Sequence, residues 1–326
     1  MENLEKQFFD ALDDNNIDIV NDLIARGVNV NAKNEIGRSA LLIAITKKLY
    51  VEKKNYTDII KLLIKSGADV NEIDRHKVSL LMKAIENDND KDIIDILIKA
   101  GADVNKLDKY DNTALMISSR RNDIDITKML IEAGADVNKV NKNDATALTF
   151  ARSRNIANIL INAGAFVDKE SLVINAVKKG HSEIVELMIE KGVDVNIIYD
   201  FNKTLLMTAI ELGDKENARF KDQAKIDIVN SLIKAGANVH VKYRDGKTLL
   251  MKACEKGYYD IVNLLIEAGV DVNETSLNYT TDERILDLLL KEIYIRQAIS
   301  TLLSLQKKDI NEKGIINKII EYAFRK

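Results

Sequence analysis

Few side chains in this chain have the types and the spacing that metal binding or catalysis requires. The three histidines, His76, His181 and His240, lie tens of residues apart. The single cysteine, Cys254, has no neighbouring cysteine or histidine, whereas a zinc site needs three or four ligands at defined spacings. Residues 87–90 resemble part of a calcium loop but lack its glycine and its final glutamate. We therefore expect no enzyme activity, no catalytic residue, no metal ion and no cofactor.

Seven other residues are candidates for binding a protein partner. Five are cations, from three consecutive segments that carry no acid at the same positions: Arg120, Arg121, Arg154, Lys178 and Lys179. A basic stripe in a slightly acidic protein suits an acidic segment of a partner. Tyr110 and Phe201 are aromatic residues of the kind favoured at interfaces. The alternative interpretation is that the cations are scattered, solvated charges.

The elements that must position these residues are set by an internal repeat. A pentapeptide close to Gly-Ala-Asp-Val-Asn occurs eight times, beginning at Gly27, Gly67, Gly101, Gly134, Gly164, Gly192, Gly236 and Gly269. Subtraction of successive residue numbers gives spacings of 40, 34, 33, 30, 28, 44 and 33. A period near 33 residues predicts a solenoid of stacked supersecondary units rather than an enzyme with one globular core.

The most regular repeat unit spans residues 241–273. Its Asp-Gly pair at 245–246 is a tight-turn signal and predicts a β-hairpin finger over residues 241–247. Thr248 can cap a first helix, LLMKACEK, and Gly257 can end it. A second helix, YDIVNLLIEA, carries a broad apolar face for burial against neighbouring units.

Finger, helix, turn and helix in about 33 residues resemble the ankyrin repeat. Matching residues include Gly-His at position 180 and Thr-x-Leu at Thr113, Thr146, Thr204 and Thr248. The resemblance covers roughly residues 4–290. It implies a mostly α ankyrin-repeat solenoid of paired antiparallel helices with short β-hairpin fingers, about seven repeats and helical caps. It also implies that a concave face of fingertips and first helices binds other proteins.

The chain departs from the family pattern at two kinds of position. Where the family has histidine in the first helix, this chain has Met82, Met116, Thr149, Met207 and Met251. The polar link that histidine provides between repeats is therefore expected to be missing, and stacking would depend on apolar contacts, for which methionine is well suited. Between paired helices, glycine is replaced by residues that tolerate left-handed backbone: Asn15, Asp88, Asn122 and Asn155.

The repeat also defines the expected domain boundaries. Residues 1–31 are expected to form an N-terminal capping repeat, and residues 274–326 a C-terminal helical cap. Between the caps, the expected ankyrin repeats span 32–71, 72–105, 106–138, 139–168, 169–196, 197–240 and 241–273.

Two repeats are long and two are short. Extra residues at 47–56 and 214–224 are expected to lengthen the turn between paired helices, either as tolerated surface growth or as an additional partner contact. The short spacing before Gly164 predicts a clipped second helix in the fourth repeat. The fifth repeat has no room for a finger at residues 168–171, so we expect a gap in the row of hairpins.

Together these features favour a non-catalytic scaffold, expected to be a monomer, that binds a protein partner and no small-molecule substrate. The formal charge of −3 argues against nucleic acid and membranes, because proteins that coat polyanions are usually basic. One cysteine and no visible signal sequence favour a cytoplasmic location, or delivery into a host cell if the protein is an effector. The alternatives are a regulatory or immunity-type subunit that inhibits or recruits an enzyme, and a nucleic-acid binder that uses the basic stripe.

Overall fold

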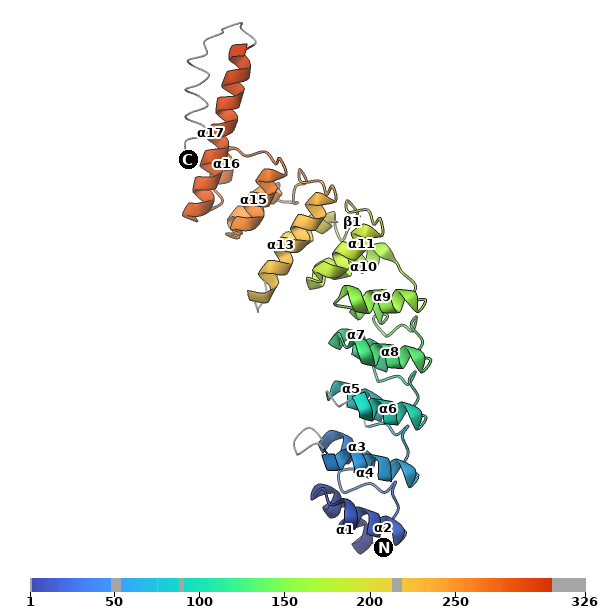
Figure 1. The fold of residues 1–326 in the computed structure, drawn as a ribbon. Coiled ribbons are helices and arrows are strands. Elements are labelled where there is room, and N and C mark those ends of the chain that lie inside the picture. The colour runs from blue at the N-terminus through green and yellow to red at the C-terminus, as the bar shows by residue number, and fades with distance from the viewer. Residues whose placement is uncertain (1, 48–53, 75, 88–90, 213–218, 307–326) are drawn as a thin grey trace. The chain divides into compact units, whose positions relative to one another are not determined.

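The computed structural model describes residues 2–47, 54–74, 76–87, 91–212 and 219–306. The chain forms two compact units, Met1–Asp168 and Lys169–Lys326 (Figure 1). Both units consist mainly of paired helices, so the mostly α repeat fold is confirmed. Across the described ranges, no helix has both the length and the apolar character needed to cross a membrane.

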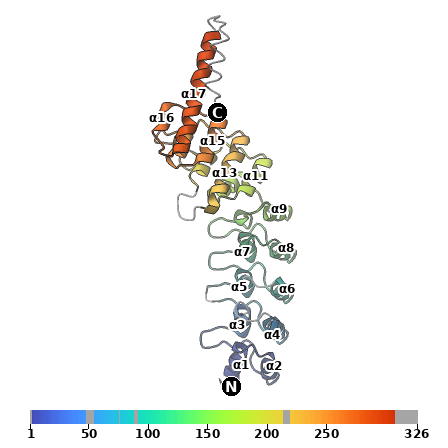
Figure 2. The same ribbon diagram turned by 60° about the vertical axis from the view of Figure 1, so that its left-hand side comes forward.

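The first unit stacks helix pairs, of which the last is shortened. Its elements are α1 (Glu2–Asp13), α2 (Ile17–Ala25), α3 (Ala40–Lys47), α4 (Lys54–Lys65), α5 (Leu80–Glu86), α6 (Lys91–Lys99), α7 (Ala114–Arg121), α8 (Ile124–Glu132), the 3₁₀ turn η1 (Leu148–Phe150) and α9 (Arg154–Asn162). The first helices of the pairs form one layer and the second helices form another, and loops project along one side (Figure 2).

The second unit continues the same pattern and ends in a long helix. Its elements are α10 (Lys169–Lys179), α11 (Ser182–Glu190), β1 (Ile198–Tyr199), β2 (Lys203–Thr204), α12 (Leu205–Ile210), α13 (Arg219–Lys234), α14 (Leu249–Glu255), α15 (Tyr259–Glu267), α16 (Glu274–Leu277) and α17 (Glu283–Gln306). Strands β1 and β2 pair antiparallel, with Ile198 opposite Thr204, and form one of the fingers.

Short polar residues set where each helix begins and ends, as the pair α7–α8 shows. The hydroxyl of Thr113 accepts the N–H of Met116 at 3.3 Å and begins α7. Asn122 ends α7 in a left-handed conformation with φ 60°. The carboxylate of Asp123 then accepts the N–H of Ile126 at 3.0 Å and begins α8. The same kind of hydroxyl cap begins α5, α12 and α14.

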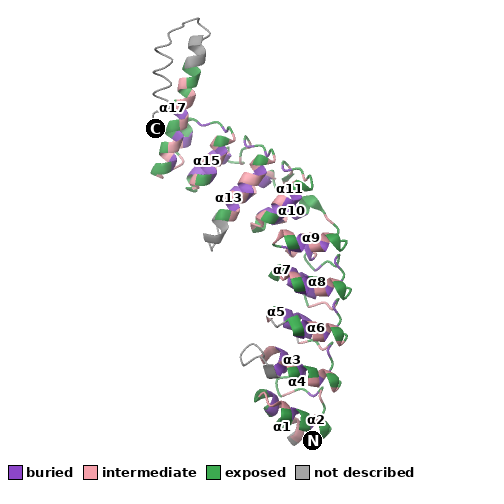
Figure 3. Ribbon diagram, in the orientation of Figure 1, coloured by how far each residue is buried: buried purple, intermediate pink, exposed green. Residues whose placement is uncertain are grey.

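Buried residues, most of them apolar, lie along the helices of both units (Figure 3). Three of the four methionines at the family's histidine position belong to this core, since Met82, Met116 and Met207 are at most 3% exposed, while Met251 is half-buried. Full burial of a side chain of this size contributes about 1.5–3 kcal/mol. Apolar stacking through methionine is therefore present, as predicted.

The predicted absence of a polar link between repeats is wrong, because asparagine supplies one. Asn105, the last residue of its pentapeptide, donates from Nδ2 to the carbonyl oxygen of Gly134 at 3.0 Å. Its Oδ1 accepts the N–H of Asp136 at 2.8 Å. The equivalent pair of bonds is made by Asn31, Asn71, Asn138 and Asn196, and we name these five residues the asparagine ladder.

The fourth repeat is shortened in its first helix, so the predicted clipping of its second helix is wrong. Helix α9 has nine residues, like α6 and α8, whereas η1 has three. Thr146 and Thr149 close the turn, since the N–H of each donates to the hydroxyl of the other at 3.1 and 3.4 Å. These bonds satisfy the backbone at the point where other repeats continue as α-helix.

The residues expected to replace glycine between paired helices behave in two ways. Asn15 and Asn122 are left-handed, with φ of 53° and 60°, as predicted. Asn155 lies inside α9 instead, because Ser153 caps that helix, and the prediction for Asn155 is wrong. Asp88 lies outside the described residues.

The first residues of α4, α10 and α13 show how the irregular repeats fold. Helix α10 starts at Lys169, which confirms that residues 168–171 form no hairpin. In both insertions the last residues are helical, since α4 begins at Lys54 and α13 at Arg219. The insertions therefore do not only lengthen the turn, and α13 reaches 16 residues against nine in α15. The parts of the insertions at 48–53 and 213–218 lie outside the described residues.

Replacing a residue of the asparagine ladder will destabilise the stack. Asn105→Ala removes the bonds to Gly134 and Asp136, which lie at the solvent-exposed edge of the repeats. Because a net hydrogen bond contributes roughly 0.5–1.5 kcal/mol, we expect the free energy of unfolding to fall by about 1–2 kcal/mol. Urea denaturation followed by circular dichroism measures this change.

The matched control for this substitution is Asn143→Ala. Asn143 is exposed at the tip of the loop before η1, and its side chain makes no hydrogen bond within the described part of the chain. We expect its free energy of unfolding to remain within about 0.5 kcal/mol of the unsubstituted chain. Equal losses for Asn105→Ala and Asn143→Ala would contradict the role of the ladder.

Candidate partner-binding surface

The residues that could have done metal or nucleophilic chemistry lie apart. The described residues contain no group of three or more histidine, cysteine or carboxylate side chains that could hold a metal ion. His76 and His240 are exposed, and His181 precedes α11. Cys254 is 1% exposed in α14, and burial raises the pKa of its thiol to about 12. The thiol is therefore protonated at neutral pH and unsuited to act as a nucleophile.

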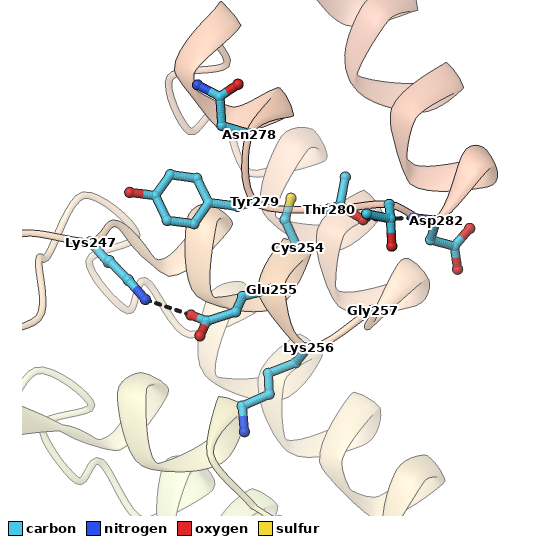
Figure 4. A pocket seen from close by; sticks show the side chains of 10 residues that line it. Lys247, Cys254, Glu255, Lys256, Gly257, Asn278, Tyr279, Thr280 and Asp282 are labelled. Atoms are coloured by element: carbon cyan, nitrogen blue, oxygen red, sulfur yellow. Dashed lines mark hydrogen bonds and ion pairs between the residues drawn. The ribbon is translucent and has the colours of Figure 1, made fainter.

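An open hollow of about 530 Å³ lies beside the end of α14 (Figure 4). Its walls include Cys254, Glu255 and the segment 278–282 between α16 and α17. The Nζ of Lys247 donates to Glu255 at 2.8 Å and lies 5.6 Å from the centre of the Tyr279 ring. Since these charges pair with each other and the thiol is buried, the lining residues offer no activated nucleophile.

Each finger of the first unit exposes one large apolar side chain. We define the four fingers as residues 32–39, 72–79, 106–113 and 139–146. Their exposed side chains, with exposed fractions of 71%, 39%, 55% and 50%, are Ile36, Ile73, Tyr110 and Val140. Elsewhere in the described first unit, the large apolar residues exposed in this way are Ile19 and Phe166. Single exposed apolar residues are common, but one in every successive finger is an organised feature.

The third finger holds Tyr110 in a defined position. The Oδ1 of Asp108 accepts the N–H groups of Tyr110 and Asn112, both at 2.8 Å. Asp111 completes the turn with φ 62°. The N–H of Lys142, in the fourth finger, donates to the carbonyl oxygen of Tyr110 at 3.1 Å. The backbone of Tyr110 is therefore fixed while its ring remains exposed.

The finger of residues 197–204 presents Phe201 from a strained turn. Asp200, Phe201 and Asn202 have consecutive positive φ values of 32°, 60° and 76°. Left-handed backbone costs roughly 1–2 kcal/mol for most residues, but aspartate and asparagine tolerate it, so in this turn the cost falls on Phe201. Arg244 supports the turn, because its Nε donates to the carbonyl oxygen of Phe201 at 3.1 Å and its guanidinium lies 5.1 Å from the ring centre. Phe201 is 82% exposed at this tip.

Of the five candidate cations, Lys178 ends a first helix as predicted but is paired, and Arg154 does not lie as predicted. Lys178 forms an ion pair with Asp200 at 2.6 Å and lies 4.9 Å from the ring centre of Tyr199, so its charge is used within the second unit. Arg154 is the first residue of α9, a second helix, and does not end a first helix. The sequence interpretation placed it one helix too early because η1 is so short.

The other three candidate cations, like Lys178, lie at the ends of first helices. Arg120 and Arg121 are exposed at the end of α7, in the first unit. Arg121 donates from Nη1 to the carbonyl oxygen of Glu86, at the end of α5, at 3.1 Å. Lys179 is exposed at the end of α10, in the second unit.

The sequence interpretation found Tyr110 and Phe201 but missed Ile36, Ile73 and Val140. An alignment of the fingers on the aspartate or asparagine that closes each turn would have found them. Ile36 and Tyr110 lie two residues after that residue, and Ile73 and Val140 lie one residue before it.

A family model described as ankyrin repeats (3 copies) matches residues 8–108, 81–171, 173–276 and 220–297. These matches cover most of the sequence, and the chain belongs to the ankyrin-repeat family. Ankyrin repeats are in general modules for protein–protein interaction, and the family typically forms non-catalytic scaffolds. No curated protein matches the chain in sequence.

The single cysteine gives a test of the buried, protonated thiol. Because burial raises the pKa of Cys254 to about 12, little thiolate exists at pH 8, and the side chain is shielded from reagents. We expect a disulfide reagent to modify the native chain at least about 100-fold more slowly than the urea-unfolded chain. Absorbance of the released thiolate measures both rates, and rapid modification of the native chain would contradict this account.

Proposed function

We propose that this protein is a non-catalytic scaffold that binds a protein partner through its fingers and first helices. The observation that carries the proposal is the row of exposed apolar residues, one in each finger of the first unit. Water contact at Ile36, Tyr110 and Val140 is unfavourable in the free chain and would be relieved in a complex. Burial of an aromatic anchor is the kind of contact that dominates interface energies.

Phe201 is the second proposed anchor. Its turn is held in a costly left-handed conformation by Arg244 and by the ion pair of Asp200 with Lys178. Strain that is maintained by neighbouring contacts is a feature of functional sites. An anchor already fixed in the free protein loses little conformational entropy on binding, which favours affinity.

Cations at the ends of first helices favour a partner whose bound segment is acidic. Arg120, Arg121 and Lys179 are exposed at these positions. In the proposed complex, they steer a partner of opposite charge and set its orientation. Lys178 and Arg154 contribute less, since Lys178 is paired with Asp200 and Arg154 lies on a second helix.

Affinity capture from an extract of the source cells tests the proposal. The purified chain is compared with a variant carrying Tyr110→Asp and Phe201→Asp, two exposed positions where a charge does not disturb the core. We expect the unsubstituted chain to retain a specific protein and the variant to retain at least about tenfold less, because each anchor is worth 1 kcal/mol or more. Quantitative mass spectrometry measures the ratio.

The matched control is Ile19→Asp, on α2. Ile19 is 47% exposed and lies on a second helix, away from the fingers. We expect it to retain the same protein as the unsubstituted chain. Equal retention by the anchor variant and by Ile19→Asp would remove the proposed role of the fingers.

A further inference from the structure

Two of the exposed finger residues, Ile73 and Val140, share an equivalent position with Leu107 in three successive fingers of the first unit. Ile73, Leu107 and Val140 each lie one residue before the side chain that closes the turn of their finger. Ile73 and Val140 are 39% and 50% exposed, and Leu107 is half-buried. Because the positions are equivalent in consecutive repeats, these three side chains repeat once per finger. We call them the base row.

Five lysines of these three fingers have no carboxylate partner. Within the described residues, no carboxylate lies within 4 Å of the Nζ atoms of Lys77, Lys106, Lys109, Lys139 and Lys142. Lys106 and Lys139 directly precede Leu107 and Val140 in the sequence. The ammonium of Lys142 donates to a backbone carbonyl oxygen, that of Lys109, at 2.6 Å.

The acids of the same three fingers are fewer or already used. Asp74 pairs with Lys83 at 3.3 Å and accepts the N–H groups of its own turn, and Asp108 accepts those of the third finger. Glu72 pairs with Lys33 at 3.0 Å. Asp108, Asp111 and Asp144 remain as carboxylates without a cation partner among the described residues. Five uncompensated ammonium groups against these three carboxylates leave the described residues of the three fingers with a positive excess of two charges, which suits an acidic ligand.

The spacing of the base row selects the conformation of the ligand. Packed helices lie about 8–10 Å apart, which sets the distance between equivalent residues of consecutive repeats. A chain in the extended polyproline II conformation advances about 3.1 Å per residue with three residues per turn, so three residues span one repeat and every third side chain lies on the same face. A β-strand would turn every third side chain to the opposite face, and a helix, at about 1.5 Å per residue, would need six or seven residues per repeat. The polyproline II chain can therefore place an apolar side chain against every finger within a short segment.

We propose that the fingers 72–79, 106–113 and 139–146 bind an extended acidic segment of the partner that carries an apolar residue at every third position. The apolar residues lie against Ile73, Leu107 and Val140, and the intervening carboxylates face the lysines. This inference rests on the proposed function, because it names the partner chemistry of the same surface.

A synthetic peptide supplies the probe. A dye-labelled ten-residue peptide of sequence Leu-Glu-Asp-Leu-Glu-Asp-Leu-Glu-Asp-Leu has the required pattern. A second peptide of the same composition, with its leucines at alternate positions, has the wrong spacing. Fluorescence anisotropy with the full chain measures both dissociation constants, and we expect the first peptide to bind about tenfold more tightly.

Variants of the chain identify where the first peptide binds. Ile73→Asp and Val140→Asp are exposed positions that remove apolar contact and add repulsion, and each is expected to weaken binding about tenfold. Lys109→Glu with Lys139→Glu is expected to weaken it by a similar factor, and Ile19→Asp to leave it unchanged. Circular dichroism shows that each variant keeps its helices.

Three results would overturn the inference. They are equal binding of the two peptides, undetectable binding of the first peptide, and binding that resists both the apolar and the lysine substitutions. Tighter, steeply salt-dependent binding of a single-stranded oligonucleotide to the same lysines would also overturn it, since the site would then suit a polyanion without apolar contacts. The proposed function fails separately, through equal capture by the Tyr110 and Phe201 variant, so the two failures are distinguishable.

Discussion

The stack depends on one side-chain amide that bonds to the backbone of the next repeat. Asn105 offers a donor to the carbonyl of Gly134 and an acceptor to the N–H of Asp136. A carboxylate could not donate and a hydroxyl could not reach both groups, so asparagine suits the five positions of the ladder. Because the bonded groups lie directly after the second helix, the ladder fixes where each pentapeptide ends and therefore where each finger begins.

Within a repeat, the residues that stabilise the fold differ from the exposed residues of the finger, which explains why the fingers can bind a partner. Methionine, leucine and isoleucine side chains fill the helix layers, and the ladder satisfies the backbone between repeats. The finger turns are closed by their own aspartate or asparagine, as Asp108 shows. Since none of these tasks falls on the residues at 73, 110 or 140, their side chains can face a partner without cost to the fold.

Sequence patterns predicted the repeat and the missing finger, because these depend on local spacing and on residues that cap or break helices. They misplaced the shortening of the fourth repeat. Reciprocal hydrogen bonds between Thr146 and Thr149 can replace the first helix of the pair without altering the spacing before Gly164. They predicted Tyr110 and Phe201 as tip residues. The pairing of Lys178 with Asp200 could not be read from the sequence, because it depends on how a left-handed turn aims one carboxylate toward a helix 22 residues away.

The replacement of a helix by η1 gives the fourth repeat a local stability that differs from that of the other repeats. Its amides at 149–151 are held by i to i+3 bonds of about 3.1 Å, with one further bond from the N–H of Thr149 to the hydroxyl of Thr146, rather than by a helical network. We expect local opening to begin there, at a free energy below that of global unfolding. The finger 139–146 leads directly into this turn, so a ligand bound to the finger would suppress the local opening. A substitution that orders the turn in the free protein would therefore raise the affinity for that ligand.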